Sequence, residues 1–292
     1  MPASYTHSFS VSSIGNAESE ERKGLDSEAR SKSWFKGRHL RVLDIDLFDT
    51  TREQAASWIV ARASTDEPTT VGFVNAHFVN LFFRRPLVRK TARRFDRLFA
   101  DGIGVSMAAR LAGIRLTENV NGTDLFPILC RKAASAQVGV YLLGGQPGVA
   151  ASAAANMQTR EPGLDVRGTS PGYFSGQQTG DAVIAQINAS GAEILLVGMG
   201  MPVQEHWIVR NRHRLRPRVV IAVGGLFDFY SGRVRRAPAL LRNNGLEWAW
   251  RLAMEPRRLF KRYVVGNAEF TTRLLARHLC GAATVTLSHT PQ

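Results

Sequence analysis

The sequence has little lysine, little cysteine and no long apolar run. Its two cysteines, Cys130 and Cys280, are too few for a disulfide framework and lack the spacing of a zinc site. No uninterrupted apolar stretch reaches about 18 residues, which argues against a transmembrane helix. The N-terminus also lacks the apolar core of a signal peptide. We therefore expect a cytoplasmic protein.

Basic charge is abundant and unevenly distributed. Lys and Arg number 38 against 24 Asp and Glu, a net charge of +14, and only six of the 38 are lysine. Residues 201–292 supply +11 of that charge. Arginine binds planar anions such as phosphates in a bidentate manner. The composition therefore predicts a phosphorylated partner or an anionic surface.

Along the 292 residues, three regions differ in pattern. Residues 1–37 are rich in serine, have no apolar periodicity and are predicted to be a disordered tail. Residues 38–236 alternate apolar runs, several ending in glycine, with helical patterns, which is typical of an α/β fold with a parallel sheet and flanking helices. The predicted strands lie within 40–48, 69–76, 96–102, 138–145, 192–200 and 218–225.

Residues 237–292 form the third region, a predicted helical appendage rich in Trp and Arg. Apolar side chains from Trp248 to Val264 define one face, interrupted at Pro256. A second face carries the basic residues Arg251, Arg257, Arg258, Lys261 and Arg262. An Arg-rich amphipathic helix with aromatic residues fits a membrane interface. The alternative is an ordinary helix that packs on the core and exposes its basic face to solvent.

Candidate site residues follow the predicted strands, because ligands of parallel sheets bind at the carboxyl ends of strands. Asp101 follows a strand and precedes a helix, so it is either a general base or a helix N-cap. Gly144 and Gly145 end another strand. There they either bring backbone amides close to a phosphate or form a structural turn. They match neither the Walker loop nor the G-x-G-x-x-G fingerprint.

Two further candidates follow the last strands. Gln204 lies at the start of a helix, where it can hydrogen-bond a sugar or a base edge. Asp228 lies near Arg233 and Arg236 in sequence. It is either a structural ion-pair partner of these arginines or a ligand for a sugar hydroxyl.

Seven segments occur in order along the chain: VNAHFVN, ADGIGV, NGTDL, LLGGQPGVA, GMGMPVQE, GGLFDFYSGRVRRAP and LEWAWRL…EPRRLFKRY. Taken together, they resemble the WecG/TagA/CpsF family of bacterial glycosyltransferases over residues 40–265. The resemblance implies a Rossmann-like domain and an inverting hexosyltransferase that needs no metal or other cofactor. It also implies transfer from a UDP-sugar to a polyprenyl-diphosphate-linked sugar, with a β-linkage, at the cytoplasmic face of the membrane. The pair Asp44 and Asp46 resembles a metal-binding motif of other glycosyltransferases, but it lies in an apolar run and no metal site is expected.

The resemblance also assigns roles to residues. Asp101 matches the proposed catalytic base, Gln204 a residue near the nucleotide-sugar, and Asn75 lies in the same cleft. Arg251 and Arg258 match appendage arginines that meet diphosphate groups.

The chain departs from the family pattern at two positions. Many members have threonine where this chain has Phe73, and arginine where it has Asn119. Both departures bear on the choice of sugar or acceptor.

The resemblance favours glucose as the transferred sugar, in exopolysaccharide or other cell-surface polysaccharide synthesis. The alternative is transfer of N-acetylmannosamine or its uronic acid to an N-acetylglucosamine-diphosphate lipid. A nucleic-acid-binding protein and a nucleotide-sugar oxidoreductase are remoter alternatives, because the chain has neither a nucleic-acid motif nor a dinucleotide fingerprint. The expected partners are thus the donor, the lipid-linked acceptor and an anionic membrane surface, with no nucleic acid. A homo-oligomer remains open.

Overall fold

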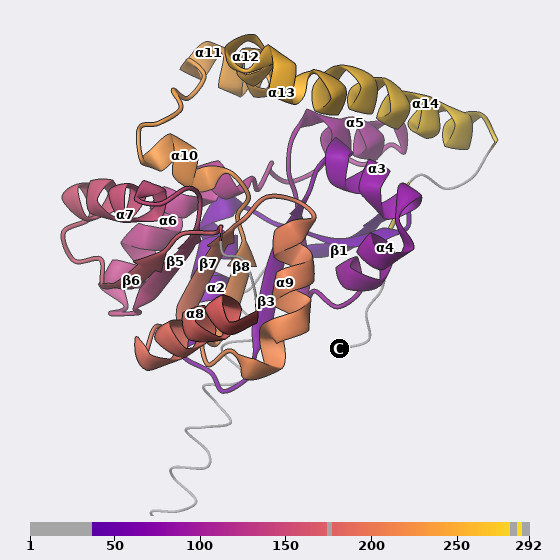
Figure 1. The fold of residues 1–292 in the computed structure, drawn as a ribbon. Helices are drawn as coiled ribbons and strands as arrows, with labels where there is room; N and C mark the ends of the chain where they lie inside the picture. Colours follow the sequence, from indigo (N-terminus) through magenta and orange to yellow (C-terminus); the bar gives the residue numbers. More distant parts are fainter. Residues whose placement is uncertain (1–36, 174–176, 281–284, 288–292) are drawn as a thin grey trace, which may run out of the picture. The chain divides into compact units, whose positions relative to one another are not determined.

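The computed structural model of the chain describes residues 37–173, 177–280 and 285–287 (Figure 1). The predicted tail, apart from Gly37, lies outside the described residues.

A six-stranded parallel sheet forms the centre of the fold, with the strand order β4-β3-β8-β7-β5-β6. This sheet and its flanking helices confirm the predicted α/β, Rossmann-like class. The strands are β3 (Thr69–Val74), β4 (Arg97–Ala100), β5 (Val140–Gly144), β6 (Val166–Ser170), β7 (Ile194–Gly198) and β8 (Val219–Ala222).

Burial explains which strands the sequence reveals. Every residue of β3, β5, β7 and β8 is buried, as expected for strands covered on both faces. Strand β6 lies at the edge of the sheet and exposes part of its surface, so it lacks a continuous apolar run. This strand was not predicted.

Helices cover both faces of the sheet and extend from its strand ends. Helices α8 (Gln177–Ala189) and α9 (Val203–Asn211) pack on one side, where Ile187 and Ile208 join the core of β5, β7 and β8. The helices up to the appendage are α2 (Arg52–Ala63), α3 (Ala76–Arg84), α4 (Pro86–Ala92), α5 (Ile103–Leu111), α6 (Gly122–Ser135), α7 (Val149–Arg160), α8 (Gln177–Ala189), α9 (Val203–Asn211), the short 3-10 helix η1 (Arg212–Arg214) and α10 (Leu226–Tyr230).

The prediction of one strand over 40–48 is wrong, because the chain turns back on itself there. Strands β1 (Arg38–Val42) and β2 (Ile45–Asp49) pair antiparallel, joined by a tight turn in which Leu43 and Asp44 have φ of 48° and 65°. Strand β9 (Val285–Leu287) pairs with the other edge of β1. Asp44 therefore lies in the turn, where it pairs with Arg277.

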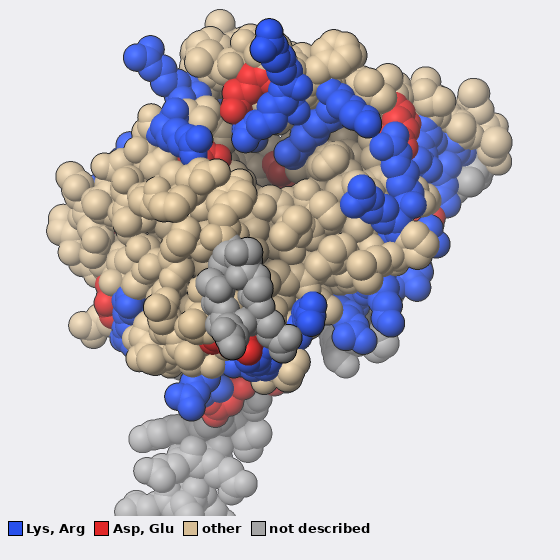
Figure 2. Space-filling view, viewed as in Figure 1, with Lys and Arg blue, Asp and Glu red and all other residues tan. Residues whose placement is uncertain are grey.

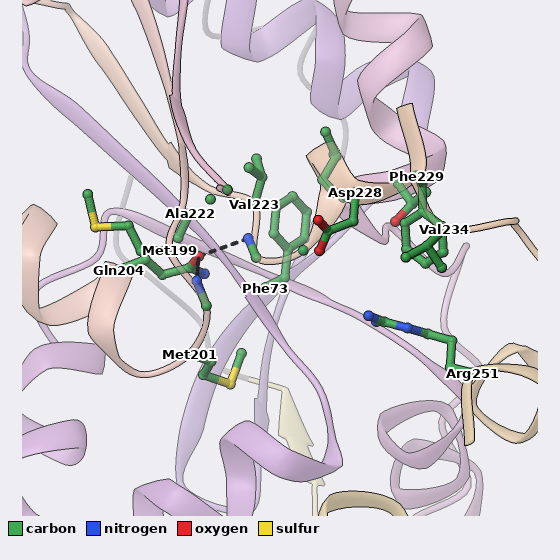
Figure 3. A pocket seen from close by; sticks show the side chains of 18 of the residues that line it. Phe73, Met199, Met201, Gln204, Ala222, Val223, Asp228, Phe229, Val234 and Arg251 are labelled. Carbon is green, nitrogen blue, oxygen red and sulfur yellow. Dashed lines mark hydrogen bonds between the residues drawn. The ribbon is translucent and has the colours of Figure 1, made fainter. Parts of the chain in front are cut away.

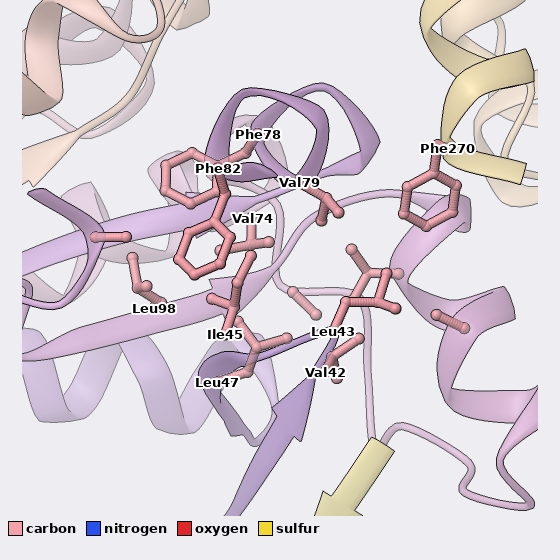
Figure 4. Packing of buried hydrophobic residues seen from close by; sticks show 14 of the residues in the cluster. Val42, Leu43, Ile45, Leu47, Val74, Phe78, Val79, Phe82, Leu98 and Phe270 are labelled. Atoms are coloured by element: carbon pink, nitrogen blue, oxygen red, sulfur yellow. The ribbon is translucent and has the colours of Figure 1, made fainter. Parts of the chain in front are cut away.

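The appendage consists of short helices followed by one longer helix, and it crosses the carboxyl-end side of the sheet (Figure 1). Phe270 and Leu274 join the same apolar core as Phe78 and Val105, so the last helix is anchored to α3 and α5 (Figure 4). None of the helices in the described part of the chain is long and apolar enough to span a bilayer. The appendage elements are α11 (Ala239–Asn243), α12 (Glu247–Met254), α13 (Pro256–Phe260), the π-helical turn η2 (Lys261–Val265) and α14 (Gly266–Leu279).

Candidate active site

A cleft opens between the carboxyl ends of the strands and the appendage, and it has two lobes. The sheet lobe, of about 460 Å³, lies over the ends of β3, β7 and β8. The appendage lobe, of about 490 Å³, lies between α3, α5, α12, the turn η2 and α14. Both volumes are typical of small-molecule sites. The residues that line both lobes are Asn75, Asp101, Thr123, Phe229, Arg251 and Arg262.

Asp101 lies at the junction of the two lobes. It follows β4, and its amide donates to the carbonyl of Val74 at 2.8 Å. The N-cap of α5 is Gly102, with φ of 88°, so the carboxylate of Asp101 does not cap that helix. Burial raises the pKa of Asp101, while Asn75, Arg262 and Arg251 act in the opposite direction. A carboxylate with a raised pKa is suited to accept a proton.

Asn75 orients this carboxylate. Its Oδ1 accepts a hydrogen bond from the amide of Phe78 at 3.1 Å and so caps α3. Its Nδ2 donates to Oδ2 of Asp101 at 3.1 Å. Because both the oxygen and the nitrogen of this amide have a partner, its orientation is fixed. The residue that positions Asp101 is therefore itself anchored at the first turn of α3.

Two arginines of the appendage enter the cleft without a counter-ion. Arg251 points from α12 into the sheet lobe, and its guanidinium carbon lies 5.0 Å from the ring centre of Phe229 (Figure 3). Arg262 comes from η2; π-helical turns are often found at functional sites. Within the described residues, neither arginine has a carboxylate within ion-pair distance, and the buried Nε of each has no hydrogen-bond partner. An uncompensated cation in a cleft favours an anionic ligand.

The position of Arg262 corrects the sequence analysis. Arg262 was assigned to the exposed basic face with Arg257 and Lys261, whereas the structure buries most of its side chain beside Asp101. Arg251, Arg258 and Arg262 are spaced seven and then four residues apart, which is the spacing of residues on one helix face. This spacing could have placed Arg262 in the cleft together with Arg251. Arg258 also lines the sheet lobe, but it is exposed and pairs with Glu255 at 2.5 Å.

Gln204 bridges two loops of the sheet lobe. Its Oε1 accepts hydrogen bonds from the amides of Gly200, at 3.2 Å, and Gly224, at 2.9 Å (Figure 3). Its Nε2 donates to Oε1 of Glu205 at 2.8 Å. Glu205 is 2% exposed, and burial raises its pKa to about 7. Gln204 therefore ties the loop after β7 to the loop after β8, and Glu205 fixes its orientation.

The predicted glycine loop has a close-packing function. A side chain at Gly144 would lie 2.4 Å from the carbonyl oxygen of Gly198, so only glycine fits between β5 and β7. Gly145 lines the sheet lobe, but its amide donates to that same carbonyl at 3.1 Å. Gly148 is the N-cap of α7.

Asp228 lines the sheet lobe opposite Arg251 (Figure 3). Within the described residues it forms no ion pair, and Arg236 pairs instead with Asp124 and Glu247. Its carboxylate is therefore free to bind a ligand hydroxyl. The described residues contain no group of three or more His, Cys, Asp and Glu side chains that would hold a metal ion.

The fold and cleft define an α/β enzyme with a buried carboxylate between two lobes and unpaired cations beside it. Residues 40–283 match the family model of the glycosyl transferase WecG/TagA/CpsF family. Because the match covers most of the chain, the protein belongs to this family and is a hexosyltransferase. The family in general uses a sugar-nucleotide donor and a lipid-linked acceptor.

Proposed function

We propose that the protein transfers a hexose, preferably glucose, from a UDP-sugar to a polyprenyl-diphosphate-linked sugar with inversion, forming a β-linkage in exopolysaccharide or cell-surface polysaccharide synthesis. One observation carries the proposal. Two separate lobes meet at Asp101, beside the unpaired Arg251 and Arg262. A transferase needs two substrates that approach one base, and both proposed substrates carry a diphosphate.

The sheet lobe is suited to the donor. It lies at the carboxyl ends of parallel strands, where nucleotides bind in open α/β sheets. Asp228 supplies a carboxylate for a sugar or ribose hydroxyl, and Arg258 lies at the rim for the diphosphate. Phe73 lies in the same lobe, with its ring against Gly122. Many family members have the hydroxyl side chain of threonine at this position. We propose that the apolar ring of Phe73 affects which donor sugar binds.

The appendage lobe is suited to the acceptor. Its lining includes the exposed apolar residues Ile103, Met107 and Leu246, which can contact the first isoprene units of a lipid carrier. Arg251 and Arg262 line the inner end of this lobe as well as the sheet lobe, so the acceptor sugar would lie beside them and beside Asp101. Asn119 lines the lobe and accepts a hydrogen bond from the amide of Gly102 at 2.7 Å.

In the proposed reaction, Asp101 removes the proton from the acceptor hydroxyl. That oxygen attacks the anomeric carbon from the face opposite the leaving group. The bond between the anomeric carbon and the phosphate oxygen breaks, and UDP leaves with the bonding electron pair. Arg251 and Arg262 stabilise the charge that develops on the diphosphate. We propose that the reaction needs no metal, because these two cations meet the charge.

We further propose that the enzyme works at the cytoplasmic face of the membrane. The appendage exposes Phe260, Val264 and Val265 beside the basic residues Arg257 and Lys261. Apolar side chains within a basic surface are typical of helices that bind anionic bilayers.

The test is release of UDP from a panel of UDP-sugars in EDTA, with and without a short-chain polyprenyl-diphosphate-glucose acceptor. We expect acceptor-dependent release from UDP-glucose. Release only with N-acetylglucosamine-diphosphate lipid and an N-acetylmannosamine-type donor would replace the glucose assignment with the alternative activity. Release that needs added Mg²⁺ would contradict metal independence. No release from any donor with either acceptor would contradict the proposed reaction.

A further inference from the structure

A second basic surface lies away from the appendage, on the helix α4. No acidic residue occurs between Glu67 and Asp96, whereas residues 84–94 contain six bases. Figure 2 shows Lys and Arg side chains gathered over α3 and α4. We define the α4 strip as the exposed residues Arg85, Leu87, Lys90, Arg93 and Arg94.

The charge of the α4 strip is uncompensated. Within the described part of the chain, none of its four cations has an acidic side chain within ion-pair distance. The neighbouring Arg84 differs, because it pairs with Glu269 of α14. Leu87 is 60% exposed, one helical turn before Lys90. An exposed leucine among unpaired cations has no evident function in the fold.

The α4 strip lies near the mouth of the appendage lobe. Helix α3 begins at this lobe, where His77 lines it, and ends at Arg84 beside the strip. Burial, followed by the charges of Arg262, Arg84 and Arg85, lowers the pKa of His77 to about 4. An arginine of the strip and an arginine of the lobe therefore both act on the same histidine. The nine-residue helix α3 is roughly 13 Å long, so the strip begins about one short helix away from the lobe.

We infer that the α4 strip is a second membrane-contacting surface, which binds the headgroups of anionic lipids next to the appendage lobe. This inference rests on the proposed function, because a polyprenyl-linked acceptor stays anchored in the bilayer while it enters the lobe. If only the appendage bound the bilayer, the enzyme would contact it at one side of the lobe. A second contact with the bilayer, through α4, would orient the opening of the lobe toward the lipid.

The composition of the strip favours lipid over nucleic acid. Single-stranded nucleic acids bind where aromatic side chains stack on the bases. The strip exposes no aromatic residue and instead presents Leu87, which can enter the headgroup region.

The experiment is flotation of the full-length protein with vesicles of 70% phosphatidylcholine and 30% phosphatidylglycerol. The strip variant combines Lys90→Gln, Arg93→Gln and Arg94→Gln. The control variant combines Arg115→Gln, Arg160→Gln and Arg216→Gln, three exposed arginines elsewhere that form no ion pair in the described residues. Both variants remove three positive charges. Each base near an anionic surface contributes about fivefold to binding, so the strip variant should bind roughly 100-fold more weakly.

We expect the control variant to bind like the wild type, and the strip variant to keep wild-type turnover on a short-chain acceptor in detergent. Equal loss by both variants would show that total charge alone drives binding and would overturn the inference. Undiminished flotation of the strip variant would overturn it as well. A wild type that binds RNA in a gel shift, but not these vesicles, would assign the strip to nucleic acid. Vesicle binding needs no donor or acceptor, so these outcomes are separate from failure of the proposed reaction.

Discussion

Asn75 donates a hydrogen bond from Nδ2 to Oδ2 of Asp101 at 3.1 Å while its Oδ1 caps helix α3. One side chain thus links the start of a helix to the carboxylate at the junction of the two lobes. The bond favours the ionised form of Asp101, whereas burial disfavours it. The protonation of Asp101 therefore depends on a balance that one substitution can shift.

Replacement of Asn75 by serine should move the pH profile of the enzyme. Serine is a good N-cap, so α3 keeps its start, but its shorter side chain loses the hydrogen bond to Asp101. Without that bond the pKa of Asp101 rises further, and the acid limb of kcat/KM shifts to higher pH. The measurement is kcat/KM against pH for wild type and Asn75→Ser. An acid limb at the same pH in both enzymes would show that Asp101 does not set the profile.

Arg262 should matter for substrate binding and not for folding. Arg262→Gln removes a charge that has no counter-ion within the described residues, so thermal stability should not fall. Loss of a hydrogen bond to a charged group costs about 1.5–3 kcal/mol, so kcat/KM should fall about 10- to 100-fold. The matched control is Arg257→Gln, which changes the same charge at an exposed position. Equal effects of both substitutions on kcat/KM would remove Arg262 from the site.

Glu205 should make the protein less stable as the pH rises toward neutrality. Burial raises its pKa from 4.5 to about 7, so the folded state binds more protons than the unfolded state between these values. Stability therefore falls as the pH rises through this window and stays lower above it.

Glu205→Gln keeps an oxygen acceptor for Gln204 and removes the charge, so it should stabilise the protein at pH 8 by at most about 3 kcal/mol. Unfolding in urea at pH 5 and pH 8 provides the measurement. A gain that is the same at both pH values would show that ionisation of Glu205 is not its cause.

The sequence revealed those parts of the fold that are buried on both faces. The central strands were visible as apolar runs, and Asp101 was found because it follows β4, an edge strand that is nonetheless largely buried. Strand β6 and the turn at Asp44 were missed, since β6 is an edge strand with a mixed pattern and a hairpin can interrupt an apolar run without glycine. The composition of a segment does not show where its chain reverses.

The site was less predictable, because it depends on side-chain direction. The sequence placed Arg262 on an exposed face, although its helical spacing from Arg251 and Arg258 is that of residues on one face, and all three line the cleft. The contact of Gln204 with Gly224 was also not predictable, since it joins two loops that are 20 residues apart and follow different strands. Periodicity shows which residues share a helix face, but it does not show whether that face meets solvent or the cleft, nor which loops lie side by side.

The most direct test of the account is turnover and donor binding of Asp101→Asn. The substitution keeps the size of the side chain and removes the proton acceptor. General-base catalysis contributes roughly 10²–10⁴-fold, so acceptor-dependent UDP release should fall by that factor while the dissociation constant of the UDP-sugar stays close to that of the wild type. Turnover at the wild-type level would contradict the proposal that Asp101, between the two lobes, is the base of the transfer.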